Sequence, residues 1–219
     1  MTGAARTDSG VHAMNFIAHF DSLTGDIDSN TDLRRKLNSF LPYDISVHDI
    51  FQVDNGCHAR YDAVSRTYNY LISTVKNPFL REFSHYVFWN IDTGAMNEAC
   101  GIIKKHTDFT SFSKLHSNNK TNLCRITEAE WVIRENGVLI FRITSNRFLR
   151  GMVRALTGTM LDIGSGKMPY QEIEVILSKK NRGAAGMSAP AAGLFLTDIS
   201  YKDHGPWPLV QGPFSNLIH

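Results

Sequence analysis

The sequence predicts a mixed α+β protein with a mostly antiparallel sheet. Three observations support this fold class. Hairpin-like strand pairs and amphipathic helices follow one another without the regular strand–helix period of a doubly wound parallel sheet. No segment of about 20 to 50 residues recurs, as it would in a solenoid. Over 219 residues, a content of 42% hydrophobic and 20% charged residues is ordinary for a globular protein with a sizeable core.

A turn followed by a strand is expected near the amino terminus, in the stretch ARTDSGVHAMNFIAHF. Gly10 permits backbone angles that a side chain forbids, and Asp8 and Ser9 can bond their own backbone. Alternation over residues 13–20 predicts the strand. Arg6 and Asp8 therefore belong to a tight loop at the edge of a sheet.

The next elements are a helix and two strands. Leucine spacing in DSNTDLRRKLNSFLP predicts a short amphipathic helix, capped by Asn30 or Thr31 and stopped by Pro42. Alternating apolar residues predict strands over 44–53 and 65–75.

From residue 92 helices become more prominent. A helix over 92–109 buries Met96, Cys100 and Ile103, and a polar loop follows. Asn136 and Gly137 indicate a tight hairpin between two strands. The remaining expected elements are the longest helix, a shorter helix and a last strand, over 147–164, 170–180 and 193–201.

Composition excludes several classes of function and site. A net charge of +2 is too small for a nonspecific nucleic-acid binder, so any polyanion site must come from local clustering. Three scattered cysteines and the lack of a leader or of an apolar run of about 20 residues favour the cytoplasm. The histidines lack metal-ligand spacing, and GxxxxGK, GxGxxG and GxSxG motifs are absent, so no metal or nucleotide cofactor is expected.

The arginines of the predicted long helix and the tyrosines of the strand over 65–75 each have two interpretations. Arg147, Arg150 and Arg154 fall on one arc of the predicted long helix, either as a solvated face or as a clamp for phosphate or carboxylate. Tyr68 and Tyr70 share one face of their strand, with Arg66 at its start. They either fill the core or, with the arginine, stack unpaired bases. Asp8 is a turn former in the simplest interpretation.

Five ordered blocks resemble a known family. GAARTDSGVHA resembles the GxGRTDxGVHA signature of the tRNA pseudouridine synthase A family, and HARYDAVSRTYNYLI resembles its HARFxAxxRxYxYxI block. DFTSFSK, NRFLRGMVRALTGTML and SAPAAGLFLTDISY are similar to the family's DFTSF, NxFLxxMVRxxxGxLL and APxxGLYLxxVxY blocks. The resemblance is colinear over nearly the whole chain.

The resemblance implies a cofactor-free isomerase that converts uridines in the anticodon arm of tRNA to pseudouridine. It assigns Asp8 as the nucleophile, Tyr68 as the tyrosine that packs against the target base, and Arg154 as the cation paired with the carboxylate. Such chemistry requires a base flipped into a closed pocket. It also requires a cation that keeps a buried carboxylate ionised.

Further roles follow from the same resemblance. Arg6 helps to displace the base, Leu194 lines the pocket, and Arg147 and Arg150 are candidates for phosphate contacts. The implied fold is a pseudouridine synthase fold of two ferredoxin-like halves, residues 1–90 and 91–219, with the active cleft between them and a homodimer as the assembly.

The chain departs from the family pattern in two ways. Ala5 and Ser9 replace a glycine and an alanine of the signature, which leaves the loop intact. The family's YDGTxFxGWQ strand and the helix after it precede the signature, whereas this chain begins just ahead of it. A misassigned start, a fragment or a shortened paralogue would each explain this, and we expect weak or no activity from residues 1–219 alone. The alternatives are a noncatalytic tRNA-binding paralogue and, far behind, a glycosidase, for which a second carboxylate is lacking.

Overall fold

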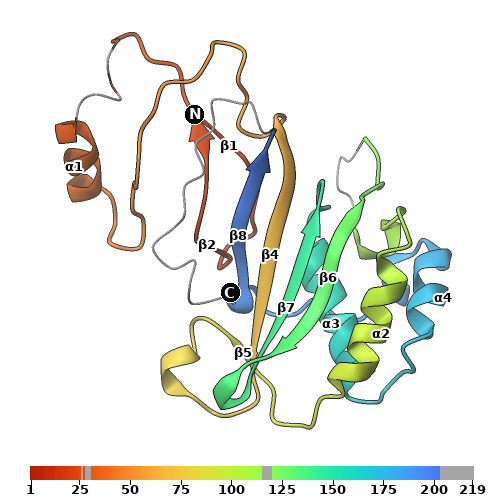
Figure 1. Cartoon of the computed structure of the whole chain (residues 1–219). Helices are drawn as coiled ribbons and strands as arrows, with labels where there is room; N and C mark the ends of the chain where they lie inside the picture. Colours follow the sequence, from red (N-terminus) through yellow and green to blue (C-terminus); the bar gives the residue numbers. More distant parts are fainter. Residues whose placement is uncertain (26, 28–30, 115–119, 203–219) are drawn as a thin grey trace.

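One six-stranded sheet forms the centre of the computed structural model, which describes residues 1–25, 27, 31–114 and 120–202. The strand order is β2-β8-β4-β7-β6, and β5 pairs with β4 (Figure 1). Only the β2–β8 and β4–β5 pairs are parallel. The predicted α+β class with a mostly antiparallel sheet is therefore confirmed. The strands are β2 (His12–Ala13), β4 (Ala63–Ser73), β5 (His85–Tyr86), β6 (Ile126–Ile133), β7 (Val138–Ser145) and β8 (Leu194–Tyr201).

Three helices lie together beside β6 and β7, and a fourth lies apart from the sheet (Figure 1). The three are α2 (Thr93–Ile103), α3 (Met152–Gly164) and α4 (Glu172–Lys179), and the fourth is α1 (Thr31–Phe40). Met96, Cys100 and Ile103 of α2 are buried, as predicted, although the helix ends at Ile103 rather than near residue 109. Of the two residues expected to cap α1, Asn30 lies outside the described residues.

The central strand β4 carries the main core face of the sheet. Tyr68, Tyr70 and Ile72 alternate along it, are all buried, and stand opposite Ile143, Phe141 and Leu139 of β7. Trp131 of β6 extends this layer by stacking on Phe141, with ring centroids 4.9 Å apart. The β6–β7 hairpin turns at Asn136 and Gly137, whose φ angles of 58° and 72° are the left-handed values that a tight hairpin needs. The predicted hairpin is therefore confirmed.

The prediction of a single strand over residues 13–20 is wrong. β2 ends at Ala13, and the chain then crosses to a separate two-stranded sheet, in which β3 (Ala18–His19) pairs with β1 (Thr2–Gly3). The apolar alternation therefore covers two short strands in different sheets, and of the residues between them only Ile17 is buried.

The strand expected over residues 44–53 is also absent. Side chains of α1, in place of a neighbouring strand, bond the backbone at residues 47 and 48. Asn38 Oδ1 accepts a hydrogen bond from Val47 N at 2.6 Å, and Asn38 Nδ2 donates to Val47 O at 2.8 Å. Arg34 Nη1 donates to His48 O. The extended backbone is thus partly satisfied without a sheet partner.

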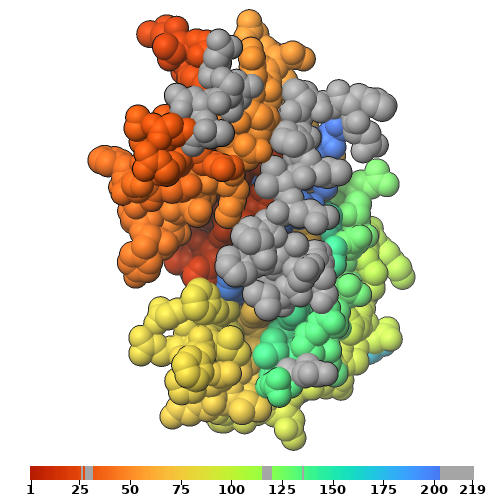
Figure 2. Space-filling model, turned by 60° about the vertical axis from the view of Figure 1, so that its left-hand side comes forward, coloured from red at the N-terminus to blue at the C-terminus, as the bar shows by residue number. Residues whose placement is uncertain are grey.

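The N-terminal elements form their own side of the molecule. Figure 2 shows the segment with α1 (orange) and the segment around η1 (Pro78–Leu80, yellow) on one side of the view and the β6–β7 hairpin (green) on the other. Both sides of residue 90 contribute strands to the central sheet, since β4 pairs with β7 and β8. The division into halves at residue 90 stays a prediction. Across the described ranges, no helix is both long and apolar enough to span a membrane.

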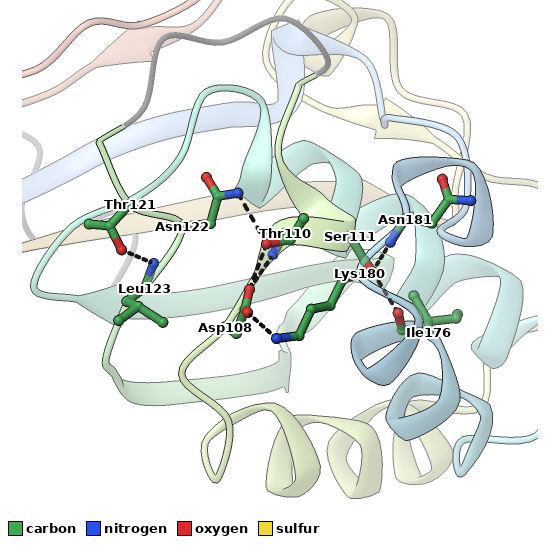
Figure 3. A network of polar contacts seen from close by, with 9 residues as sticks. All are labelled: Asp108, Thr110, Ser111, Thr121, Asn122, Leu123, Ile176, Lys180 and Asn181. Atoms are coloured by element: carbon green, nitrogen blue, oxygen red, sulfur yellow. Dashed lines mark hydrogen bonds and ion pairs between the residues drawn. The ribbon is translucent and has the colours of Figure 1, made fainter.

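The DFTSF block joins the polar loop to α4 (Figure 3). Asp108 Oδ1 accepts hydrogen bonds from Thr110 N at 3.0 Å and from Thr110 Oγ1 at 2.6 Å, while Oδ2 pairs with Lys180 Nζ at 2.8 Å. Ser111 Oγ donates to Ile176 O at 2.6 Å and accepts from Asn181 N. This motif is therefore a structural brace between η2 (Thr110–Phe112) and α4.

Asp108 gives the stability of the fold a defined pH dependence. The hydrogen bonds from Lys180 and then Thr110 lower the pKa of Asp108. The stabilisation is therefore complete above the pKa of an unfolded aspartate, about 3.9, and is lost as the pH falls through the lower folded value. We expect Asp108→Asn to lower the free energy of unfolding by about 1–2 kcal/mol at pH 7. In urea titrations the two proteins should converge once the pH has fallen below the folded pKa of Asp108. A pH dependence unchanged in Lys180→Gln would contradict Lys180 as the main cause.

Candidate functional site

The Asp8 loop, residues 5–11, is a tight turn held at both ends. Val11 N donates to Asp8 O at 3.2 Å, and Gly10 has a φ of +79°, the left-handed conformation expected from the sequence. Before the loop, Ala4 N donates to Ile17 O, and after it β2 pairs in parallel with β8. The predicted loop at the edge of a sheet is confirmed.

Arg154, on the first turn of α3, pairs with Asp8. Its Nη1 donates to Asp8 Oδ2 at 3.1 Å, and each side chain is 24% exposed. Its Nε donates at 2.7 Å to Ala189 O, which fixes the plane of the guanidinium. The carboxylate thus faces a cation whose orientation is set by two separate acceptors.

Arg150 approaches the second oxygen of the same carboxylate. Its Nε lies 3.6 Å from Asp8 Oδ1, a distance for an ion pair rather than a hydrogen bond, and its side chain is 62% exposed. The sequence predicted a helix from Arg147, but α3 begins at Met152, because Gly151 has a φ of +72° and interrupts the helical path. Arg147 and Arg150 therefore precede the helix, and the expected arginine stripe on one helical arc is wrong. Arg150 and Arg154 nevertheless meet at Asp8.

The backbone of the segment 186–193 holds Arg154 in place. The sequence analysis did not predict this role of the segment. Ala189 N donates to Arg154 O at 3.0 Å, which closes a pair of bonds with the contact to Ala189 O. Tyr70 Oη donates to Pro190 O at 2.8 Å. The close approach requires a glycine at position 158, where a Cβ would lie 1.7 Å from Met187 O. Every residue type carries a backbone carbonyl, so the sequence does not reveal these contacts. A glycine such as Gly158 reveals only that two segments approach closely.

Tyr68 and Leu194 lie in the core beside this region. The ring of Tyr68 packs edge-on against Phe148, with centroids 5.1 Å apart. Burial raises the pKa of Tyr68 to about 12, so the side chain is a neutral phenol at physiological pH. Leu194 is buried at the start of β8, opposite Tyr70. Arg6 is exposed on the Asp8 loop.

Arg66 does not present its guanidinium for base stacking beside the tyrosines. The side chain turns to four backbone carbonyls, those of Ala4, Arg60, Ala63 and Asn146. The stacking interpretation of Arg66 is therefore wrong.

The site combines a carboxylate, two guanidinium groups and an aromatic core. A carboxylate that a guanidinium holds by one oxygen has a fixed position and can act as a nucleophile. Within the described ranges, no group of three or more His, Cys, Asp or Glu side chains suits a metal ion.

This constellation, on a mixed α+β fold, coincides with a known class of enzyme. Residues 106–202, which include α3, Arg150, Arg154 and β8, match the family model described as tRNA pseudouridine synthase. The class defined by the fold and the site is therefore that of the pseudouridine synthases.

Curated relatives narrow the class. The chain is 45% identical to tRNA pseudouridine synthase A of Bacteroides fragilis, over 91% of the chain and 79% of that protein. It is 47% identical to tRNA pseudouridine synthase A of Azobacteroides pseudotrichonymphae, over 92% and 80%. The corresponding protein of Bacillus pumilus is 37% identical over 93% and 82%. The chain belongs to the tRNA pseudouridine synthase A family, as its sequence blocks predicted.

Proposed function

We propose that the chain isomerises uridine to pseudouridine in tRNA, with Asp8 as the nucleophile. Membership of the tRNA pseudouridine synthase A family supports the reaction. The 3.1 Å bond between Arg154 Nη1 and Asp8 Oδ2 supports the role of the aspartate, because it fixes the position of the carboxylate at the edge of the sheet.

The reaction needs no redox partner. The N1–C1′ glycosidic bond breaks, the uracil turns within the site, and a C5–C1′ bond forms. The proton on C5 is lost, and N1 gains a proton, so the composition of the RNA is unchanged. Asp8 bonds covalently to the nucleoside while the base turns, at either the sugar or the base, and is released at the end.

The other site residues have distinct parts in this proposal. Arg154 pairs with the carboxylate and orients it. Tyr68 packs against the uracil, and Leu194 lines the pocket. Arg6 helps to displace the base from its stack, which a base-flipping enzyme requires. Arg147 and the exposed side chain of Arg150 contact phosphates.

The finer attributes belong to the same proposal. The substrate region is the anticodon arm, the assembly is a homodimer, and the compartment is the cytoplasm. The three described cysteines are free, and burial raises the pKa of Cys100 to about 12 and of Cys124 to about 11. Unreactive free thiols suit a reducing compartment.

Isomerisation is tested with tRNA transcripts tritiated at carbon 5 of uridine. We expect slow but measurable release of tritium to water under single-turnover conditions with the protein in excess, and no change in the mass of an unlabelled transcript. A transcript of unrelated sequence is the control. Tight tRNA binding without any release would overturn the proposal in favour of the noncatalytic paralogue. Robust multiple turnover would instead refute the weak activity expected of residues 1–219 alone.

Arg154→Lys tests the double anchoring of the cation. A lysine keeps the charge, but its single ammonium cannot hold Asp8 and Ala189 in the fixed plane of a guanidinium. We expect single-turnover rates to fall roughly 10- to 100-fold, with the melting temperature little changed. Arg81→Lys, in the exposed ion pair with Glu82, is the control. An unchanged rate in Arg154→Lys would mean that charge alone suffices.

A further inference from the structure

We propose that Arg66 is a positioning residue that holds the Asp8 loop in register with the segment leading to Arg150 and Arg154. The inference rests on the proposed function for its catalytic consequence, but its structural basis is independent of the reaction. Arg66 touches neither Asp8 nor the arginines by any hydrogen bond or ion pair described for it. It acts through backbone atoms on either side of them.

The guanidinium of Arg66 connects three separate parts of the chain. Nη2 donates to Ala4 O at 3.1 Å and to Arg60 O at 2.6 Å. Nη1 donates to Ala63 O at 3.2 Å and to Asn146 O at 3.1 Å. The amino terminus, the turn before β4 and the end of β7 therefore converge on one side chain.

The two distant acceptors stand in equivalent positions relative to the site. Ala4 lies four residues before Asp8, and Asn146 lies four residues before Arg150. Both are fixed: Ala4 is 1% exposed and bonds Ile17, and Asn146 Oδ1 accepts from Arg125 N at 2.7 Å. Movement at Ala4 or Asn146 would thus be passed along a short stretch of chain to the Asp8–Arg150 pair.

The chemistry of the contact requires an arginine. Four carbonyl oxygens from different directions need a planar group with several donors in fixed positions, which a lysine ammonium on a flexible stem does not provide. Among the described residues, no carboxylate lies within ion-pair distance of Arg66, so its charge is balanced by carbonyl dipoles. Burial lowers the pKa of Arg66, in keeping with this desolvated position.

Arg182 is a useful comparison, because its side chain bonds only residues that are close to it in the sequence. Its hydrogen bonds go to Ala185 O, Gly186 O and Ser188 Oγ, all within six residues of it. Arg66, in contrast, joins residues as far apart as 4 and 146. Its neighbour two positions on is Tyr68, so the strand that carries the arginine also places the tyrosine of the proposed site.

Arg66→Lys and Arg66→Gln test the inference. We expect single-turnover rates to fall roughly 10- to 100-fold in both, with the dissociation constant for tRNA within about threefold of wild type, because no proposed phosphate contact is removed. Amide hydrogen exchange should be faster in segments 5–9 and 147–150, while α2 keeps its protection.

Ser111→Ala is the matched control. It removes a fully buried hydroxyl with two hydrogen bonds on the side of α4, so it lowers stability without loosening the three converging segments. Unchanged exchange in both segments, or a rate loss equal to that of Ser111→Ala at matched stability, would overturn the proposal. Faster exchange with an inactive wild-type protein would support the positioning role and refute the proposed function.

Discussion

Asp8→Ala is expected to lower the rate of tritium release by at least about three orders of magnitude. The substitution removes the proposed nucleophile and leaves Arg154 with only its bond to Ala189 O. Binding of tRNA should persist or tighten slightly, because a negative charge disappears near the phosphate backbone. Single-turnover release and a filter-binding titration on the same preparation separate the two effects.

Asp162→Ala is the matched control for this experiment. Asp162 is 25% exposed and pairs with Lys167 at 2.9 Å, so it resembles Asp8 in burial and in having a cationic partner, but it lies near the end of α3. We expect this variant to isomerise tRNA at a rate close to wild type. If Asp8→Ala retained a rate within about tenfold of wild type, another group would have to be the nucleophile.

Gly158→Ala is expected to disrupt the contacts by which the segment 186–193 holds Arg154. The added Cβ would lie 1.7 Å from Met187 O and 2.9 Å from Met187 C, and both are backbone atoms that cannot rotate away. The segment 186–193 must move off α3, which breaks both bonds between Arg154 and Ala189. We expect a loss of about 2–4 kcal/mol in the free energy of unfolding, a melting temperature lower by roughly 5–10 °C, and a rate about a hundredfold lower.

Gly101→Ala provides the opposite expectation in another helix. Gly101 lies within α2, and a Cβ there would meet no atom within 4 Å. Alanine should therefore stabilise the protein by about 0.5–1 kcal/mol through helix propensity and lower chain entropy. Calorimetry of the two variants compares the same chemical change with and without the backbone clash. Equal stability of both variants would contradict the described approach of residue 187 to α3.

The elements with strong local patterns were predictable from the sequence. The alternation of Tyr68, Tyr70 and Ile72 predicts β4, and the Asn136–Gly137 pair predicts the hairpin. Residues 44–53 have the same alternation but form no strand, and the backbone of Val47 bonds the side chain of Asn38 instead. Such a choice depends on a tertiary partner, which a local pattern does not contain.

The residues of the candidate site were predictable from the sequence, but the contacts that hold them in position were not. The blocks around Asp8 and Arg154 predicted the carboxylate–cation pair, and the structure brings them together. Arg150, which was expected at a phosphate, also approaches Asp8. The contacts of Arg66 and of the segment 186–193 use backbone carbonyls, which every residue type carries. Their acceptors are therefore invisible in sequence, whereas Gly158 and Gly186 indicate the close approach of the segment to α3.

β2 and β8 pair through residues far apart in the sequence, His12 with Phe195 and Ala13 with Leu196. This separation determines when the pair can form during synthesis of the chain. At translation rates of about 5–20 residues per second, the two partners leave the ribosome roughly ten to forty seconds apart. A growing polypeptide thus carries its aspartate long before the strand that anchors it exists, and the closure of so long a loop is slow. We therefore expect β2 and the Asp8 loop before it to gain their anchor on β8 only after residues 195–196 have been synthesised.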